Sequence, residues 1–198
     1  MLAADLNCQH SVGCVNMGVT SSNPKAFDVL KQRIKEIEGK QLKVGWFSSA
    51  VYENGTPVAA VAQIQEFGSP ARSIPPRPFM RPTIFKNENE WKQNIASGAK
   101  KVVAGDMSPQ DLLGLLGMKV QGQIQETIEE VTAPPLSPIT LGARKYRHEG
   151  KPVTGATIGE IARKLKDGSL DISGVPTKPL VDTGYLIATI SNIVEDSK

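Results

Sequence analysis

Two cysteines and a histidine near the N-terminus are the residues best suited to binding a metal. Cys8, His10 and Cys14 form a C-x-H-x3-C pattern, and thiolates and imidazoles are typical zinc ligands. A structural zinc site normally takes four ligands in two spaced pairs, and His148 lies far away in sequence. We therefore expect no metal site, and we interpret residues 1–22 as a flexible N-terminal arm.

The sequence VDTG places a carboxylate beside a hydroxyl near the C-terminus. A D-T-G motif supplies the catalytic aspartate of aspartic proteases, in which two such carboxylates share a proton. Only Asp182 lies in such a motif, and the following residues, GYLIATI, favour a short helix. We therefore expect Asp182 or Thr183 to cap that helix rather than to act in catalysis.

No other spacing of residues indicates catalysis or a cofactor. The chain has no G-x-x-x-x-G-K-[ST] phosphate loop and no G-x-S-x-G motif, and its glycines do not form a dinucleotide fingerprint after a strand. We expect a protein with no catalytic residues, no cofactor and no enzymatic activity.

The composition is typical of a soluble globular chain. The 198 residues are 39% hydrophobic and 22% charged, with a formal net charge of +3. No stretch approaches the roughly 18 apolar residues of a membrane-spanning helix, and the first twenty residues lack the pattern of a secretion signal. We therefore expect no contact with a membrane and assembly in a cytoplasm.

Charge changes sign in blocks along the chain. Residues 72–101 and 141–166 each contain seven basic and two acidic side chains, whereas residues 106–131 contain one basic and five acidic ones. Residues 167–198 are again acidic, with five carboxylates against two basic groups. Such blocks are either solvated helix faces or complementary patches that join one subunit to the next.

Apolar periodicity predicts four longer helices and two strands. Apolar residues three or four positions apart predict helices over residues 23–39, 57–68, 84–103 and 108–131. Alternation in QLKVGWF predicts a strand, and a second is expected near residues 190–194. We expect an α+β fold in which a small, mainly antiparallel sheet is covered by these four helices.

Two proline-rich tracks interrupt the helices. IPPRPFMRP joins the second helix to the third, and TAPPLSPIT, residues 132–140, is expected to be extended rather than helical. ARKYRHEGKPVTG is then expected to be a basic loop, followed by a short helix that ends at Gly168. The predicted organisation is a single domain, residues 23–198, with an extended and basic insertion over about 132–176 that lies on neighbouring subunits.

Five segments in this order resemble a known family. VGW, GTPVAAVAQIQEFGS, IPPRPFMRP, PPLSPITL and KPLVDTGYLIATI are similar to motifs of bacteriophage neck or tail-completion proteins, also described as virion morphogenesis proteins. The resemblance spans about residues 42–194. It implies a structural virion protein at the head–tail junction of a long-tailed phage, which forms a hexameric or dodecameric ring and contacts other neck and tail proteins.

Several residues are candidates for contacts between subunits. We expect Phe79 and Met80 to anchor a contact or the edge of the core, with Asp182 of KPLVDTG as a further contact. Arg77 and Arg81 are expected to meet acidic groups of the next subunit, at Glu126, Glu129 or Glu130. The alternative is that Phe79 only fills its own core and the arginines are solvated.

Other functions remain open from sequence. A tail terminator or minor tail protein differs in position more than in chemistry. A small basic DNA-binding module is a further alternative, although the chain lacks a known DNA-binding motif. Weak contact of a ring with passing DNA is compatible with the neck function. The basic residues that would bind DNA are Arg72, Arg77, Arg81, Lys100, Lys101, Arg144, Lys145 and Arg147.

Overall fold

The computed structural model describes residues 24–197, and these residues form an α+β fold. Seven α-helices, one 3-10 helix and two strands occur in this part of the chain. In order they are α1 (Pro24–Glu38), β1 (Lys40–Gly45), α2 (Val58–Phe67), η1 (Pro70–Arg72), α3 (Met80–Ala104), α4 (Pro109–Glu130), α5 (Pro138–His148), α6 (Gly155–Lys166), α7 (Tyr185–Ala188) and β2 (Ser191–Asp196).

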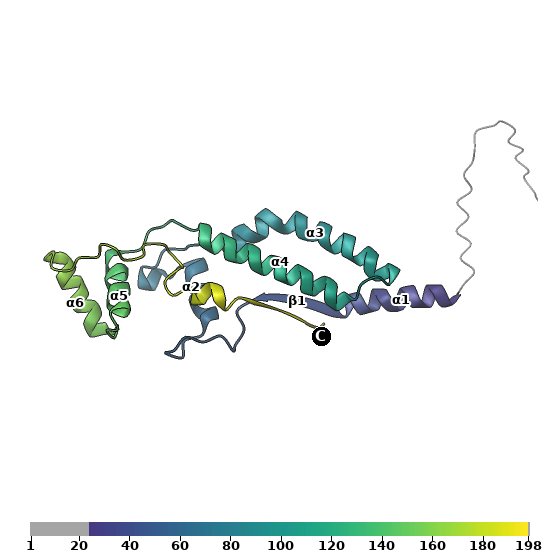
Figure 1. Ribbon diagram of the computed structural model, residues 1–198, viewed down its shortest axis with the longest axis horizontal. Coiled ribbons are helices and arrows are strands. Elements are labelled where there is room, and N and C mark those ends of the chain that lie inside the picture. Colours follow the sequence, from purple (N-terminus) through teal and green to yellow (C-terminus); the bar gives the residue numbers. More distant parts are fainter. Residues whose placement is uncertain (1–23, 198) are drawn as a thin grey trace, which may run out of the picture.

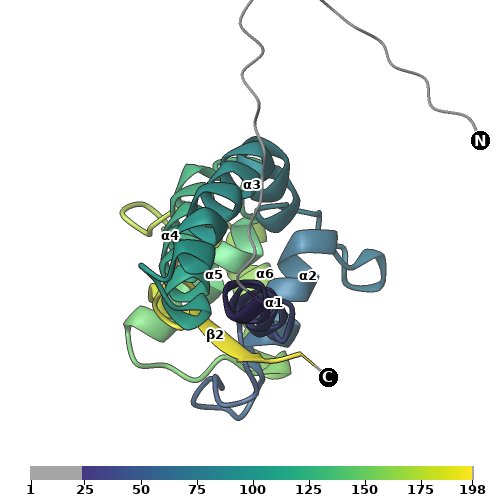
Figure 2. The ribbon, with the colours of Figure 1, turned by 90° about the vertical axis from the view of Figure 1, so that its right-hand side faces the viewer.

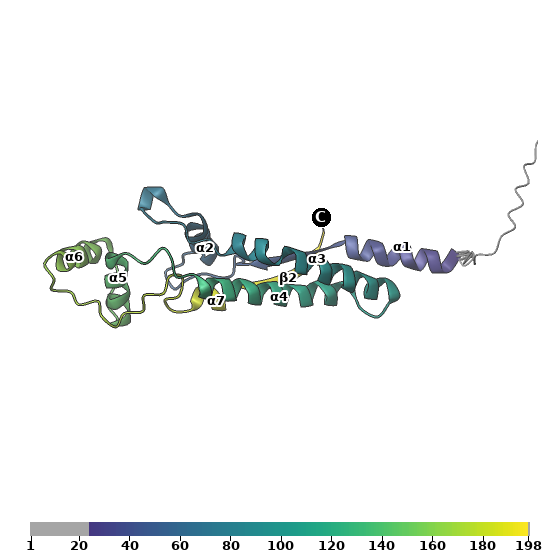
Figure 3. The same ribbon diagram turned by 90° about the horizontal axis from the view of Figure 1, so that it is seen from above.

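The elements are arranged along one long axis. The two longest helices, α3 and α4, run side by side through the middle, α1 projects at one end, and α5 and α6 lie at the other (Figures 1 and 3). The guanidinium of Arg33 donates to the carbonyl oxygen of Val103 at 2.6 Å. This bond joins α1 to the last turn of α3, where carbonyl groups lack partners within the helix.

The sheet consists of β1 and β2, paired antiparallel with Leu42 opposite Val194. The helix α4 lies across both strands, whereas α3 packs mainly on α4. Figure 2, along the long axis, shows both helices on one side of β2. The antiparallel sheet is confirmed, but the expectation that four helices cover it is wrong, because α1 extends away from its end.

Glycine permits the close approach of α4 to the sheet. A Cβ atom at Gly117 would lie 2.8 Å from side-chain atoms of Leu42 and Asn192, closer than packed side chains tolerate. Gly114 and Gly122, on the same helix, have open space around them. Of these three glycines, only Gly117 is required for close packing.

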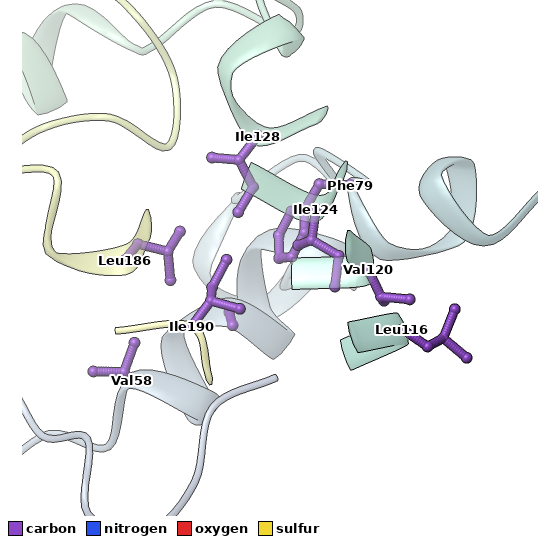
Figure 4. Packing of buried hydrophobic residues seen from close by; sticks show 9 residues of the cluster. Val58, Phe79, Leu116, Val120, Ile124, Ile128, Leu186 and Ile190 are labelled. Carbon is purple, nitrogen blue, oxygen red and sulfur yellow. The ribbon is translucent and has the colours of Figure 1, made fainter. Parts of the chain in front are cut away.

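The core gathers side chains from α2, α4, α7 and the segment before α3 (Figure 4). Phe79 is fully buried, and its ring and that of Trp46 pack nearly perpendicular to each other, with the centroids 5.6 Å apart. The indole N–H of Trp46 donates to the carbonyl oxygen of Leu186 at 2.9 Å. The buried members of this cluster are Val58, Ala62, Phe79, Leu116, Val120, Ile124, Ile128, Leu186 and Ile190.

Residues 132–176 are more helical than the sequence suggested. The prediction of an extended track through residue 140 and a basic loop after it is wrong, because α5 begins at Pro138. Proline suits the first position of a helix, and the Ser137 hydroxyl accepts the backbone N–H of Thr140. The expected short helix before Gly168 is confirmed as α6.

The helices α5 and α6 pack on each other around a separate small cluster. Ala143, Tyr146 and Ile161 are buried there, with Ile158, Leu165 and Leu170 around them. A Cβ atom at Gly142 would lie 2.5 Å from the Ile161 side chain, so the two helices meet closely at this position. We refer to α5, α6 and this cluster as the α5–α6 module.

The N-terminal residues and the possibility of a membrane-spanning helix were also considered from the sequence. The predicted arm, residues 1–22, which includes Cys8, His10 and Cys14, lies outside the described part. Within residues 24–197, no helix combines the length and apolar character needed to cross a membrane.

Candidate interaction site

Glu66, near the end of α2, accepts hydrogen bonds from the start of α3. Its carboxylate is 4% exposed and accepts the backbone N–H groups of Phe79 at 2.7 Å and Met80 at 2.9 Å. It also accepts the Arg81 side chain at 2.9 Å and, at 3.3 Å, the Arg81 backbone N–H. The first N–H groups of a helix have no partner within the helix, so Glu66 supplies the acceptor that α3 lacks.

The contacts of Glu66 favour the ionised form of its side chain over the protonated form. Burial alone would raise the pKa of Glu66, but hydrogen bonds from the Arg81 side chain and three backbone N–H groups outweigh it and hold the pKa below its ordinary value. Glu66 therefore remains ionised near neutral pH and acts as a structural anion. Sequence patterns did not predict this role, because the partners of Glu66 lie 13 to 15 residues further along the chain.

Arg77 joins the two proline-rich tracks. Its side chain is 4% exposed and donates to the carbonyl oxygens of Pro134 at 2.8 Å and Pro135 at 3.0 Å. Its backbone N–H donates to the carbonyl oxygen of Gln65 at 2.7 Å. The planar guanidinium suits two parallel carbonyl acceptors. The segment before α3 and the connector that leads to α5 are thus held together within one chain.

The structure places the predicted interaction residues differently from the sequence. Phe79 lies in the core and Met80 packs against it, so they belong to the subunit's own interior. Arg77 donates to the carbonyl oxygens of Pro134 and Pro135, and Arg81 pairs with Glu66, all within the chain. Their pairing with acidic groups of the next subunit stays a prediction. The acidic residues Glu126, Glu129 and Glu130 are exposed near the end of α4, and Glu130 lies 4.0 Å from Lys86.

Asp182 forms a second, partly buried junction, between the α5–α6 module and the segment before α7. Its carboxylate pairs with Arg147, lies 3.2 Å from Nε2 of His148 and lies 3.6 Å from Nε of Arg144. Arg144 also donates to the carbonyl oxygens of Pro176 and Lys178.

Asp182 or Thr183 was predicted to cap the helix that follows, and the structure supports this only for Thr183. The Thr183 hydroxyl accepts the backbone N–H of Tyr185 at 3.3 Å, whereas Asp182 faces α5 and caps nothing. Its carboxylate is surrounded by cations that bind it, which is a structural contact and not the shared-proton pair of a protease.

A groove of about 1160 Å³ separates the α5–α6 module from the body of the protein. Its lining includes Val51, Tyr52, Leu136 and Arg147. The Tyr185 hydroxyl donates to the carbonyl oxygen of Val51, and the rings of Tyr52 and Tyr185 lie 5.2 Å apart. Burial, followed by Tyr185 and Asp182, raises the pKa of Tyr52, so its phenol stays protonated near neutral pH.

An exposed aromatic patch lies where α2 meets α3. Phe67 is 61% exposed and Phe85 is 88% exposed, and the guanidinium carbon of Arg81 lies 5.0 Å from the centre of the Phe67 ring. Phe85 follows Arg81 by four residues and therefore lies on the same face of α3. Aromatic residues with arginine are enriched at protein interfaces. Sequence reasoning assigned neither phenylalanine to an interface, although Phe67 belongs to the EFG segment.

Metal binding is not supported by the described residues. Within residues 24–197, no three histidine, cysteine, aspartate or glutamate side chains are grouped closely enough to hold an ion.

Comparison with known proteins found no similar one. No family model, no curated protein and no solved structure matches the chain.

Proposed function

We propose that this chain is a structural virion protein of the head–tail junction, a neck or tail-completion protein that forms a ring. Support for the phage assignment comes from the ordered segments EFG, IPPRPFMRP, PPLSP and KPLVDTG. In the fold these segments adjoin one another: Glu66 and Arg81 link the first two, and Arg77 links the second to the third. Because these segments contact one another in the fold, their resemblance to the phage family is better treated as one combined pattern than as separate short matches.

The observation that carries an assembly role is the amount of apolar surface left uncovered. Large apolar side chains are exposed on α1, at the end of α2, on α3 and on α4, which is more than scattered single residues on a compact monomer. The side chains concerned are Phe27, Ile34, Phe67, Ile84, Phe85, Ile95, Leu115 and Met118. Subunits of a ring would cover such faces with the neighbouring copies.

A structural role also agrees with the use of buried and partly buried charged side chains. Glu66 binds the start of a helix, Arg77 and Arg144 bind backbone carbonyl oxygens, and Asp182 binds cations of α5. These groups stabilise the connections between segments.

The DNA-binding alternative receives less support. Arg77 and Arg144 are buried, Arg81 pairs with Glu66, Arg147 pairs with Asp182, and Lys145 donates to the Asp171 carbonyl oxygen. Five of the eight basic residues considered for DNA are therefore engaged within the chain. Salt-dependent affinity for duplex DNA by the isolated protein, without ring formation, would favour this alternative.

Electron microscopy of particles assembled without this protein tests the proposal. We expect DNA-filled heads and separate finished tails, with joined virions restored when the wild-type chain is supplied from a plasmid. Complementation by a Phe67→Ser, Phe85→Ser variant should be weaker than by the wild type. Normal virions in the absence of the protein would overturn the assignment. Heads with malformed or overlong tails would favour a tail terminator instead.

A further inference from the structure

The two-stranded sheet has two open edges. In the described part of the chain, β1 and β2 pair only with each other, and no third strand joins either one. A lone pair of strands is marginally stable, and helix α4 covers only one face of this pair. An exposed strand edge is a template for pairing with a strand of another chain.

The register identifies the backbone groups that face outward. Ser197 donates its N–H to the carbonyl oxygen of Gly39 at 2.8 Å, and the register continued by one residue sets these two opposite each other. Hydrogen-bonded pairs alternate with non-bonded pairs in antiparallel sheets, so odd-numbered residues bond across the sheet. Even-numbered residues point their backbone N–H and C=O groups outward, away from the partner strand. The central ones make no backbone hydrogen bond to another described residue; they are Leu42, Val44, Asn192 and Val194.

The two edges carry opposite charge. The strand β1, KQLKVG, contains two lysines and no carboxylate, whereas β2, SNIVED, contains two carboxylates and no basic residue. Inside the chain these groups already pair, Lys40 with Asp196 at 2.6 Å and Lys43 with Glu195. A β1 edge and a β2 edge are therefore electrostatically complementary, whereas two β1 edges or two β2 edges repel each other.

We propose that the β1 edge of one copy pairs antiparallel with the β2 edge of a second copy. Strand direction then alternates through every junction, and each copy repeats the same contact with the next. Such a head-to-tail contact closes into a ring when the rotation per copy allows it. The inference rests on the ring part of the proposed function and names the surface through which the ring forms. The occupant of each open edge is a second copy of this chain.

Proline at an outward-facing position tests the contact directly. Val194→Pro removes one outward N–H, and proline is tolerated on an edge strand when that N–H faces solvent. We expect the variant to keep the circular dichroism spectrum of the wild type but to lose oligomer mass in multi-angle light scattering. The matched control, Ile193→Pro, removes an N–H that bonds to β1 and should destabilise the subunit itself.

Hydrogen exchange adds a readout on the strand that is not mutated. In the wild-type oligomer, the amides of Leu42 and Val44 should be protected by the neighbouring copy. In Val194→Pro these amides should exchange at least tenfold faster, while amides of α4 remain unchanged. Equal exchange of Leu42 and Val44 in both proteins, or an oligomer unaffected by Val194→Pro, would overturn the inference.

A charge-swapped variant tests which edges meet, and it preserves the pairs within each chain. The variant carries Lys40→Glu, Lys43→Glu, Glu195→Lys and Asp196→Lys, so its own β1 and β2 edges remain complementary. It should assemble with itself but fail to mix with wild-type subunits in native mass spectrometry. Free mixing would contradict the charge argument.

The outcome for the wild type separates this inference from the proposed function. A wild-type chain that stays monomeric up to its solubility limit would overturn strand pairing between copies. It would not change the microscopy of particles that lack the protein, on which the neck assignment depends. Conversely, strand-paired rings together with normal virions in the absence of the protein would retain the contact and reject the neck role.

Discussion

Glu66 illustrates how a single carboxylate fixes the joint between two helices. Its folded pKa lies below the ordinary value of 4.5, so it contributes stability that is fully present above that value. As the pH falls through the lower, folded pKa, protonation removes the acceptor of the α3 N–H groups and that stability is lost.

The Glu66→Gln variant tests this role. We expect a loss of about 2 kcal/mol in the free energy of unfolding at pH 7, because charge-assisted hydrogen bonds become neutral ones. The difference from wild type should shrink as the pH falls below about 4, where the wild-type carboxyl is protonated as well. Urea unfolding at several pH values measures both effects. A pH-independent difference would show that the carboxylate charge is irrelevant.

Arg77 is a buried cation whose closest partners are carbonyl oxygens, and this makes its replacement informative. Arg77→Met should lower the free energy of unfolding by about 2–3 kcal/mol, because the carbonyl groups of Pro134 and Pro135 lose a charged donor. Arg77→Lys should give an intermediate loss, since an ammonium lacks the planar fork. Arg72→Met, at an exposed position on η1, is the matched control and should change stability little. Chemical denaturation measures all three, and equal effects of Arg77→Met and Arg72→Met would contradict the role.

At the scale of elements, Asp182 holds the α5–α6 module against the segment before α7. Asp182→Asn removes the charge that faces Arg144 and Arg147, while the side chain keeps its size. We expect faster amide exchange in α5 and in residues 176–184, and a loss of about 2 kcal/mol in stability. The control, Asp167→Asn, alters a carboxylate that binds only the turn at Ser169 and should leave α5 unchanged. Faster exchange over the whole chain would indicate general unfolding instead.

Sequence periodicity predicted the elements that bury a regular apolar face. The helices α1, α3 and α4 repeat large apolar residues every three or four positions, and the strand β1 alternates, so each was predicted. The start of α3 was placed too late, because Met80, Arg81 and Pro82 of IPPRPFMRP form its first turn instead of belonging to the connector. The helix α5 was missed because its buried face consists of Gly142, Ala143, Arg144 and Tyr146, which show no apolar repeat. Pro138 was interpreted as a breaker although it occupies a first helical turn.

The candidate site was less predictable than the elements. The motif IPPRPFMRP was correctly singled out, but its partners were not, because Glu66 and the carbonyl oxygens of Pro134 and Pro135 meet it only through the fold. No local spacing encodes such contacts. A buried arginine bound by backbone carbonyls is indistinguishable in sequence from a solvated one.

At the scale of the whole molecule, α1 is the element with the least support from its own chain. It projects from one end of the long axis, and Phe27 and Ile34 are 55% and 40% exposed (Figure 1). These residues lie seven positions apart on one side of the helix, together with the half-buried Leu30 and Ile37. In the proposed ring, this apolar stripe is where a neighbouring subunit would pack.

A paired substitution tests whether the stripe of α1 belongs to an interface. Phe27→Ser with Ile34→Ser should weaken self-association at least tenfold, since burial of two large apolar side chains contributes about 1.5–3 kcal/mol each. Val29→Ser is the control: Val29 is 45% exposed on the same helix but lies on the opposite side. Sedimentation velocity over a concentration series gives the association constants. If Val29→Ser weakens association as strongly as the stripe variant, helix stability rather than an interface explains the effect, because serine lowers helix propensity at either site.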